Sequence, residues 1–161
     1  MVNLRVDAVR LPDGREVERE VVEHPGAAAV VPLTERDEVL MVRQYRYAVG
    51  QILLELPAGT LEPGEDPLAC AVRELAEELG ATARRWEPLA TLFYSPGFLT
   101  EVMHLFLASD LVEGEPRPGP DERLTVERIP LPEAVELVRR GEVRDAKSVA
   151  GLLLVARMKG I

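Results

Sequence analysis

The segment Gly59–Ala81, with the sequence GTLEPGEDPLACAVRELAEELGA, predicts a loop that runs directly into an acidic helix. Proline and glycine fill its first part, and a helical pattern begins at about Pro67. Proline suits the first turn of a helix because its missing N–H would have no intrahelical partner there, and Asp66 before it is a favourable N-cap. Gly80 is a typical residue to end the helix.

The apolar residues of this helix predict which side faces a core. At about 100° per residue their spacing forms one narrow stripe, made of Leu68, Val72, Leu75 and Leu79. Glu74 and Glu78 are four residues apart and therefore stack on a flank beside that stripe. Glu77 points to the far side, where Arg73 can pair with it.

Two carboxylates stacked four residues apart repel each other, so Glu74 and Glu78 have two interpretations. One is a solvated acidic face, which charge alone favours. The other is a site for a hard divalent cation, because Mg²⁺ binds carboxylate and water oxygens and bridges to substrate phosphates. The spacing of the surrounding residues shifts the balance towards the cation site.

That spacing resembles the Nudix box, G-x5-E-x7-R-E-U-x-E-E-x-G-U, in which U is a bulky aliphatic residue. The matching positions are Gly59, Glu65, Arg73, Glu74, Leu75, Glu77, Glu78 and Gly80. Only the last position departs, with Ala81 where a larger residue is usual, which should weaken packing more than chemistry. The resemblance implies an enzyme that hydrolyses a nucleoside diphosphate linked to another group, with bound Mg²⁺ or a similar metal such as Mn²⁺ or Zn²⁺.

Composition limits the class of protein. The 161 residues correspond to one domain, residues 1–161, and the net charge of −9 argues against general nucleic-acid binding. No apolar run is long enough to span a bilayer and the N-terminus lacks a signal-peptide core, so we expect a cytoplasmic protein with no membrane partner. The single cysteine, Cys70, is interpreted as a small apolar filler.

Residues 1–24 predict a β-hairpin, with strands at 3–10 and 17–23 on either side of the turn sequence Leu11-Pro12-Asp13-Gly14. A two-stranded hairpin alone is marginal in water, so it must pack on this domain or on a second subunit. In the ADP-ribose pyrophosphatase branch of the Nudix family such a sheet reaches across a homodimer and helps to form the adenosine site. The resemblance therefore implies a homodimer.

The rest of the chain predicts an α/β fold. Strands are expected at residues 26–33, 39–47, 51–56, 86–93, 102–109 and 124–129, and further helices at 132–140 and 145–158. Residues 112–122 predict a loop, because they are rich in proline, glycine and charge. The expected architecture is a mixed sheet covered by helices on both sides, an α/β/α sandwich, which agrees with the Nudix fold.

Pyrophosphate hydrolysis requires charge neutralisation, an activated water and a stabilised leaving phosphate, and metal ions supply all three. Glu74 and Glu78 are the first candidates for metal ligands, because the helix places them on one flank. The resemblance adds the backbone carbonyl of Ala58. A catalytic role for Glu77 requires local distortion or an indirect task. Arg73 and Glu65 are expected to hold loop and helix together.

Residues outside the box indicate the substrate class. The sequences Gln44-Tyr45-Arg46, Glu55-Leu56-Pro57-Ala58-Gly59 and Ser95-Pro96-Gly97, with Glu101 beyond the last, resemble the ADP-ribose pyrophosphatase branch. The candidate substrate-binding residues are Arg46, Glu55, Gln44, Ser95, Gly97 and Glu101.

Three of these candidates have alternative interpretations. Arg46 suits a pyrophosphate, because a guanidinium binds two phosphate oxygens at once, but an ordinary strand-end cation is equally compatible with its position. Glu55 can fix Arg46, bind an adenine amine or form a structural salt bridge. Glu101 can approach a metal-bound water or a ribose hydroxyl.

The catalytic base of this branch tends to be a glutamate on a mobile late loop, where this chain offers Asp121 and Glu122. Glu122 is our candidate. The branch often has a further acid two residues on, where this chain has Leu124, so the match is incomplete.

The resemblance implies a Mg²⁺-dependent enzyme that cuts ADP-ribose into AMP and ribose 5-phosphate. Other diphosphates, namely FAD, NADH or a nucleotide sugar, are alternative substrates. A hypothesis of a different class is a module that senses ADP-ribose without cutting it. The intact set Glu74, Glu77 and Glu78 argues against a sensor, because a pure binder has no need of a metal cluster.

Overall fold

The computed structural model describes residues 3–116 and 123–161. Its strands are β1 Asn3–Arg10, β2 Glu16–Glu23, β3 Ala27–Pro32, β4 Glu38–Arg46, β5 Gln51–Glu55, β6 Ala58–Thr60, β7 Thr82–Phe93, β8 Val102–Val112 and β9 Leu124–Pro130. Its helices are α1 Pro67–Leu79, α2 Leu131–Arg139 and α3 Ala146–Lys159, with a short 3₁₀ turn, η1, at Tyr47–Val49. None of these helices is long and apolar enough to cross a membrane.

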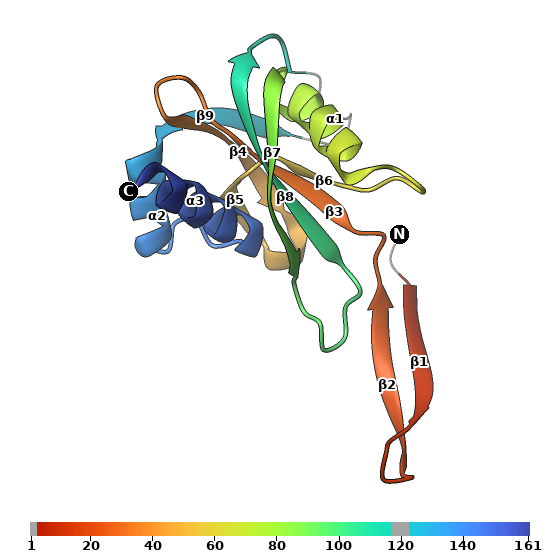
Figure 1. Cartoon of the computed structure of the whole chain (residues 1–161). Coiled ribbons are helices and arrows are strands. Elements are labelled where there is room, and N and C mark those ends of the chain that lie inside the picture. The colour runs from red at the N-terminus through yellow and green to blue at the C-terminus, as the bar shows by residue number, and fades with distance from the viewer. Residues whose placement is uncertain (1–2, 117–122) are drawn as a thin grey trace.

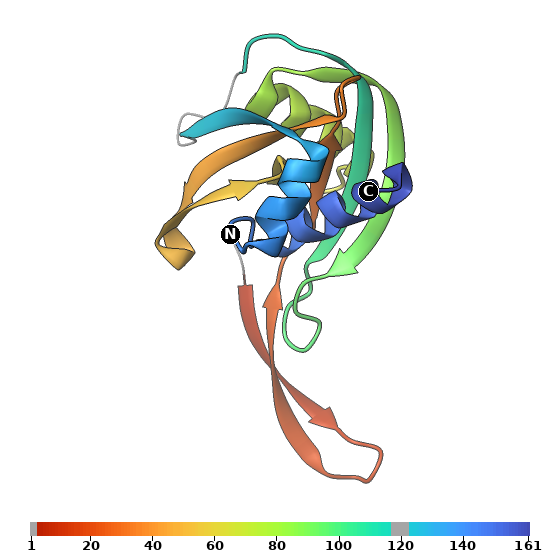
Figure 2. The same cartoon turned by 90° about the vertical axis from the view of Figure 1, so that its left-hand side faces the viewer.

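The strands of the described residues are divided among three sheets. The central sheet has the order β6-β3-β8-β7 and is mixed, because β3 runs parallel to β8 and antiparallel to β6. A second, antiparallel sheet has the order β5-β4-β9. The hairpin β1-β2 forms the third and projects from the body (Figures 1 and 2).

Helices cover both sides of these sheets, as the sequence predicts. Figure 1 shows α1 on one side and α2 with α3 on the other. Neighbouring residues of β3 and β4 divide between the two layers: Val30 and Val42 pack with α1, whereas Val31 and Met41 pack with the C-terminal helices. This division explains the unbroken apolar runs, because a strand covered on both faces has no solvent side. The α/β/α sandwich is confirmed.

The ends of α1 are as predicted. The Asp66 carboxylate accepts hydrogen bonds from the backbone N–H groups of Leu68 and Ala69, at 2.9 and 3.2 Å, and caps the helix. Gly80 follows the last turn with φ of 64°, a left-handed conformation that favours glycine. The loop and the helix are therefore fixed by local chemistry.

The predicted apolar stripe of α1 is wrong in its first half. Leu68 and Val72 are 38% and 42% exposed, whereas Leu75 is fully buried. The helix is turned so that Glu74 and Glu78 face the sheet instead of solvent, and the first two residues of the stripe are turned outward as a result. The stripe was built from the spacing of apolar residues alone, which does not register that this helix also buries two carboxylates.

Two differences concern the strands. The short strand β6 was not expected, because it contains a glycine and spans only Ala58–Thr60. Strand β7 begins at Thr82 instead of residue 86, and β8 continues to Val112 instead of 109, because Thr82 pairs with Val112. Cross-strand pairing thus extends both strands through residues whose local sequence does not alternate clearly.

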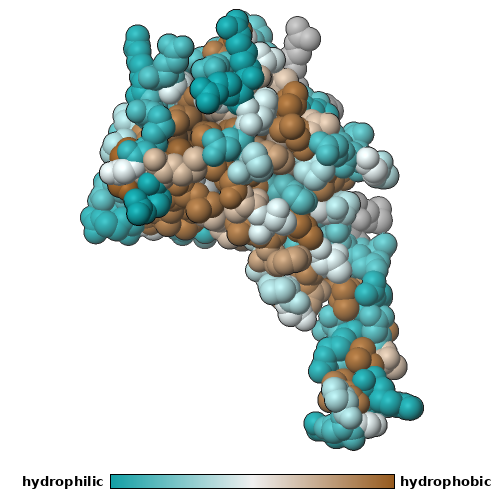
Figure 3. Space-filling view, viewed as in Figure 1, coloured by the Kyte–Doolittle hydropathy of each residue, from teal (hydrophilic) through white to brown (hydrophobic). Residues whose placement is uncertain are grey.

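The hairpin is attached to the body at its base. The backbone N–H of Val22 donates to the Phe98 carbonyl at 2.7 Å, and the N–H of Thr100 donates to the Val22 carbonyl at 3.0 Å. Leu4, which pairs with Val22, and Val6, two residues further along β1, are 69% and 56% exposed, and Figure 3 shows apolar atoms along this arm. The hairpin therefore reaches away from the core with apolar side chains in solvent.

Candidate active site

Glu74 and Glu78 lie on the face of α1 that packs against β6. They are only 7% and 2% exposed. The backbone N–H of Ala58 donates to Glu78 Oε2 at 3.1 Å. A Cβ atom built on Gly59 would lie 1.7 Å from Glu74 Oε1, so the strand leaves no room for a side chain at Gly59. Both carboxylates are thus held against one short strand.

Arg73 joins α1 to the preceding loop. Its guanidinium donates to both oxygens of Glu65 at 3.0 Å, and to the Thr60 carbonyl at 3.3 Å. It also contacts Glu74 at 2.5 Å and Glu77 at 3.3 Å. The predicted contact between loop and helix is confirmed, as is the pairing of Arg73 with Glu77.

The bond between Glu65 and Arg73 predicts a pH-dependent contribution to stability. The hydrogen bond from Arg73 lowers the pKa of Glu65 from 4.5 to about 2. Ionised Glu65 therefore stabilises the fold above its unfolded pKa, and this stabilisation is lost as the pH falls from about 5 to 2. We expect Glu65→Gln to unfold at lower urea concentration than wild type at pH 7, with a gap that closes towards pH 2. A gap that stays constant across this range contradicts the prediction.

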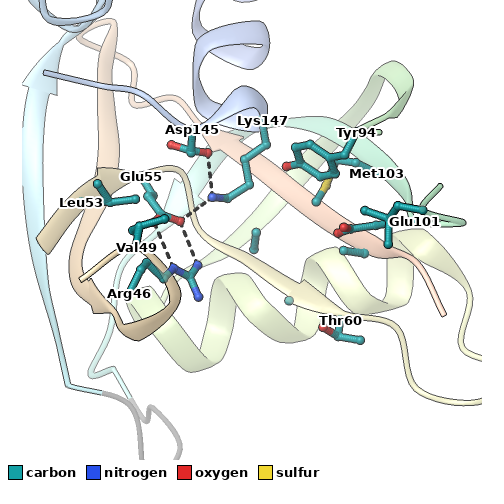
Figure 4. Close-up of a pocket in the computed structure, with 14 residues that line it drawn as sticks. Arg46, Val49, Leu53, Glu55, Thr60, Tyr94, Glu101, Met103, Asp145 and Lys147 are labelled. Carbon is teal, nitrogen blue, oxygen red and sulfur yellow. Dashed lines mark hydrogen bonds and ion pairs between the residues drawn. The ribbon is translucent and has the colours of Figure 1, made fainter. Parts of the chain in front are cut away.

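A cavity of about 570 Å³ opens beside β6 (Figure 4). Its volume is typical of ligand pockets. Four charged side chains gather on one side, whereas Tyr94, Met103 and Glu101 lie on the other (Figure 4). The lining residues are Ala27, Arg46, Val49, Leu53, Glu55, Ala58, Gly59, Thr60, Tyr94, Leu99, Glu101, Met103, Asp145 and Lys147.

The polar wall is a connected set of four charges. Arg46 binds Glu55 through two hydrogen bonds, from Nε to Oε1 at 3.0 Å and from Nη2 to Oε2 at 2.8 Å. Lys147 Nζ contacts the same Glu55 Oε2 at 2.5 Å and Asp145 Oδ1 at 2.8 Å. Figure 4 shows these contacts as dashed lines along the cavity. These contacts agree with two of the alternatives for Glu55, the one in which it fixes Arg46 and the structural salt bridge.

Both partners of the Arg46–Glu55 pair stay charged. Burial pushes the pKa of Glu55 up, but the hydrogen bonds and charges of Arg46 and Lys147 outweigh burial, and the net change is downward. The hydrogen bond with Glu55 in turn raises the pKa of Arg46. A fixed, permanently charged guanidinium therefore borders the cavity.

Of the candidate substrate-binding residues near the turn at Ser95, only Glu101 lines the cavity. Glu101 lines the cavity on the side opposite Arg46 (Figure 4). Ser95 and Gly97 belong to the turn before it, where the Ser95 carbonyl accepts from the N–H of Leu99 at 2.9 Å, and neither lines the cavity.

Gln44 also lies outside the cavity lining. Its buried Nε2 has no hydrogen-bond partner within residues 3–116 and 123–161. Glu122 and Asp121 lie outside the described residues, so the candidate base stays a prediction.

Sequence reasoning missed several cavity residues, among them Lys147, Asp145 and Tyr94. Lys147 stands near the start of a strongly apolar helix, and a lysine there is the signal that could have found it. Burial, together with the charge of Asp145, raises the pKa of Tyr94. Tyr94 therefore keeps its phenolic proton at neutral pH and can donate a hydrogen bond in the cavity.

Cys70 is buried on α1, and burial raises the pKa of its thiol from 9.0 to about 11. The thiol therefore stays protonated at neutral pH, which agrees with its interpretation as a filler.

The acidic face of α1 fits a divalent cation bound together with substrate. Among the described residues, no group of three or more His, Cys, Asp or Glu side chains is arranged as a complete metal site. Glu74 and Glu78 nevertheless place two buried carboxylates against β6, with Glu74 close to Gly59 and Glu78 bonded to the Ala58 N–H. Magnesium is commonly bound by one or two carboxylates, and water and substrate phosphates complete its coordination shell. The two carboxylates Glu74 and Glu78 agree with this coordination.

Comparisons with known proteins agree with this geometry. The family pattern described as NUDIX domain matches residues 23–152. The chain is 41% identical over 150 residues to "ADP-ribose pyrophosphatase" of Bacillus subtilis (strain 168), covering 92% of this chain and 81% of the relative. It is 44% identical over 155 residues to "ADP-ribose pyrophosphatase" of Mycobacterium tuberculosis, covering 94% and 75%.

A solved structure, "Crystal structure of ADP compounds hydrolase", superposes with a TM-score of 0.82 at 26% identity and covers 99% of this chain and 95% of its own. The fold and the matched segment together define this chain as a member of the Nudix family. It is a Nudix hydrolase, and enzymes of this family depend in general on divalent metal ions.

Proposed function

We propose that this protein hydrolyses the pyrophosphate bond of ADP-ribose and releases AMP and ribose 5-phosphate. One observation carries the proposal: Arg46 lines the same cavity as Ala58 and Gly59 of β6, and the buried carboxylates of α1, Glu74 and Glu78, lie directly against these two strand residues. Acidic ligands for a cation and a fixed cation for phosphate both neutralise the charge of a diphosphate, which is one requirement for its cleavage. The two ADP-ribose pyrophosphatases similar to this chain support the same substrate.

Each group has a distinct task in this proposal. Glu74, Glu78 and the Ala58 carbonyl hold the metal, and we propose Mg²⁺, with Mn²⁺ or Zn²⁺ as substitutes. When bound, the metal supplies charge neutralisation and water activation. Arg46, fixed by Glu55, holds the diphosphate through charged hydrogen bonds. Glu101 borders the opposite side, where it can accept a hydrogen bond from a sugar hydroxyl.

The roles of the remaining candidates are proposed on the resemblance. Glu77 acts through Arg73, its partner at 3.3 Å. Gln44, Ser95 and Gly97 shape the approach to the cavity without lining it. Glu122 is proposed as the catalytic base.

A substrate panel tests the function. The enzyme is incubated with Mg²⁺ and ADP-ribose, FAD, NADH or a nucleotide sugar, and the products are separated by chromatography. We expect AMP and ribose 5-phosphate from ADP-ribose at the highest kcat/KM. Faster cleavage of another diphosphate reassigns the substrate, and bound but uncut ADP-ribose favours a sensor. The cytoplasmic location expected from the sequence stays a prediction.

We further propose that residues 1–161 act as one catalytic domain and that the hairpin 1–24 joins two copies into a homodimer. The exposed Leu4 and Val6 support this, because a projecting two-stranded arm with apolar side chains gains stability when another surface covers it. Light scattering should give twice the chain mass of 17.8 kDa. Replacing Leu4 and Val6 by serine should shift the mass towards one chain, and a monomeric wild type would refute the dimer.

A further inference from the structure

Lys147 occupies a position that is costly for a lysine. Its side chain is 7% exposed, and it is the second residue of α3. Burial disfavours an ammonium ion, and the positive end of the helix dipole disfavours a cation at this end. A lysine at such a position needs strong anionic partners to offset these costs.

The anionic partners of Lys147 are Asp145 and Glu55, and Glu55 connects Lys147 to Arg46. Asp145 holds the ammonium from one side at 2.8 Å and Glu55 from the other at 2.5 Å. Glu55 is itself 2% exposed, and both of its carboxylate oxygens accept hydrogen bonds from Arg46. The order is therefore Asp145, Lys147, Glu55, Arg46, and Figure 4 shows it running along one wall of the cavity. Of the four side chains, Arg46 is the most exposed, at 42%.

We propose that Lys147 is a positioning residue for diphosphate binding: it anchors Glu55, and Glu55 aligns the guanidinium of Arg46 towards the cavity. Because this role takes Arg46 as a phosphate ligand, it rests on the function proposed above. Although Lys147 lines the cavity, its ammonium is held by two carboxylates, so in this role it acts through Glu55 and not as a direct phosphate ligand.

Charge balance explains why a cation is needed at this point. Arg46 and Lys147 carry two positive charges, and Glu55 and Asp145 carry two negative charges. Without Lys147 the group has a net negative charge beside a diphosphate site, and Glu55 is left with Arg46 as its cationic partner. Both effects weaken phosphate binding by Arg46, and neither touches the reacting atoms.

The test compares the two lysines of α3. Lys147→Met should raise KM for ADP-ribose about tenfold, equivalent to about 1.4 kcal/mol, with kcat within about twofold of wild type. Lys159→Met is the matched control, because Lys159 also pairs with an aspartate, Asp37, at 2.6 Å but on the exposed surface. Its KM should not change. Unchanged KM in Lys147→Met, or an equal change in Lys159→Met, overturns the proposal.

A double-mutant cycle tests whether Lys147 acts through Arg46. Adding Lys147→Met to Arg46→Met should raise KM no further, because the group that it positions is gone. Full additivity of the two changes overturns the proposed route. A merely structural lysine would lower the melting temperature of both backgrounds and leave KM of the folded enzyme unaltered.

A second variant and a binding measurement separate loss of folding from loss of positioning. If Lys147→Met does not fold, Lys147→Gln retains a hydrogen-bond donor for Glu55 without the charge, and its KM should rise in the same direction. Calorimetric titration with ADP-ribose in the absence of divalent metal measures affinity without turnover. A wild type that binds but does not cleave refutes the proposed function alone, whereas equal affinity of wild type and Lys147→Met refutes the positioning role.

Discussion

Replacing Glu78 by glutamine should abolish turnover while the protein stays folded. We expect kcat to fall about 10³-fold, equivalent to about 4 kcal/mol of transition-state stabilisation. The amide oxygen can still accept the hydrogen bond from the Ala58 N–H, so the contact between α1 and β6 survives. What is lost is a negatively charged oxygen that a divalent cation requires. Steady-state kinetics across a Mg²⁺ series measures the effect.

Glu133→Gln provides a control, because Glu133 is an exposed carboxylate on α2, on the other side of the sheet. It should retain wild-type kinetics. Thermal melting should show that both variants are folded. Wild-type rates in Glu78→Gln at saturating Mg²⁺ would refute its assignment as a metal ligand.

Gly59→Ala should inactivate the enzyme more than it destabilises the fold. The added methyl group would lie 1.7 Å from Glu74 Oε1 and 2.0 Å from Cδ, so the carboxylate must move. Because this clash involves the flexible end of a side chain, the backbone can remain as it is. A displacement of about 1 Å at a catalytic group costs about 10²-fold in rate, and we expect kcat to fall by at least that amount.

The matched control is Gly141→Ala, at the end of α2. There the φ angle is +71° and a Cβ would meet nothing within 4 Å, so the cost is backbone strain alone. We expect Gly141→Ala to lower the urea midpoint and leave kcat unchanged. If Gly59→Ala keeps full activity, Glu74 does not need its observed position, and the metal site proposed here is wrong.

Local chemistry made the centre of this site predictable. The cap at Asp66, the end of the helix at Gly80 and the flank formed by Glu74 and Glu78 all follow from spacings within a single helix. The loop contact between Glu65 and Arg73 spans only eight residues. Such features depend on the geometry of the helix itself, so sequence is sufficient to find them.

Features that depend on distant contacts were not predictable in the same way. Lys147 lies 92 residues beyond Glu55, and no local pattern links them. Leu68 and Val72 face outward because the packing of α1 against β6 and the central sheet decides which face of the helix is buried. This is a tertiary effect that the helix sequence alone does not show. Short strands such as β6 form because a neighbour pairs with them, and a three-residue segment carries too little pattern to show this.

The hydrogen bonds at Val22 connect the hairpin β1-β2 to the segment Phe98–Thr100, which lies beside the cavity. Thr100, which bonds to Val22, is followed by Glu101, and Glu101 Oε1 lies 4.0 Å from His24 Nδ1 at the foot of the arm. We therefore expect a change in what the arm touches to reach the cavity through Thr100 and Glu101. If the arm docks on a second copy, dilution that separates the copies would loosen this corner, and activity per chain would depend on protein concentration.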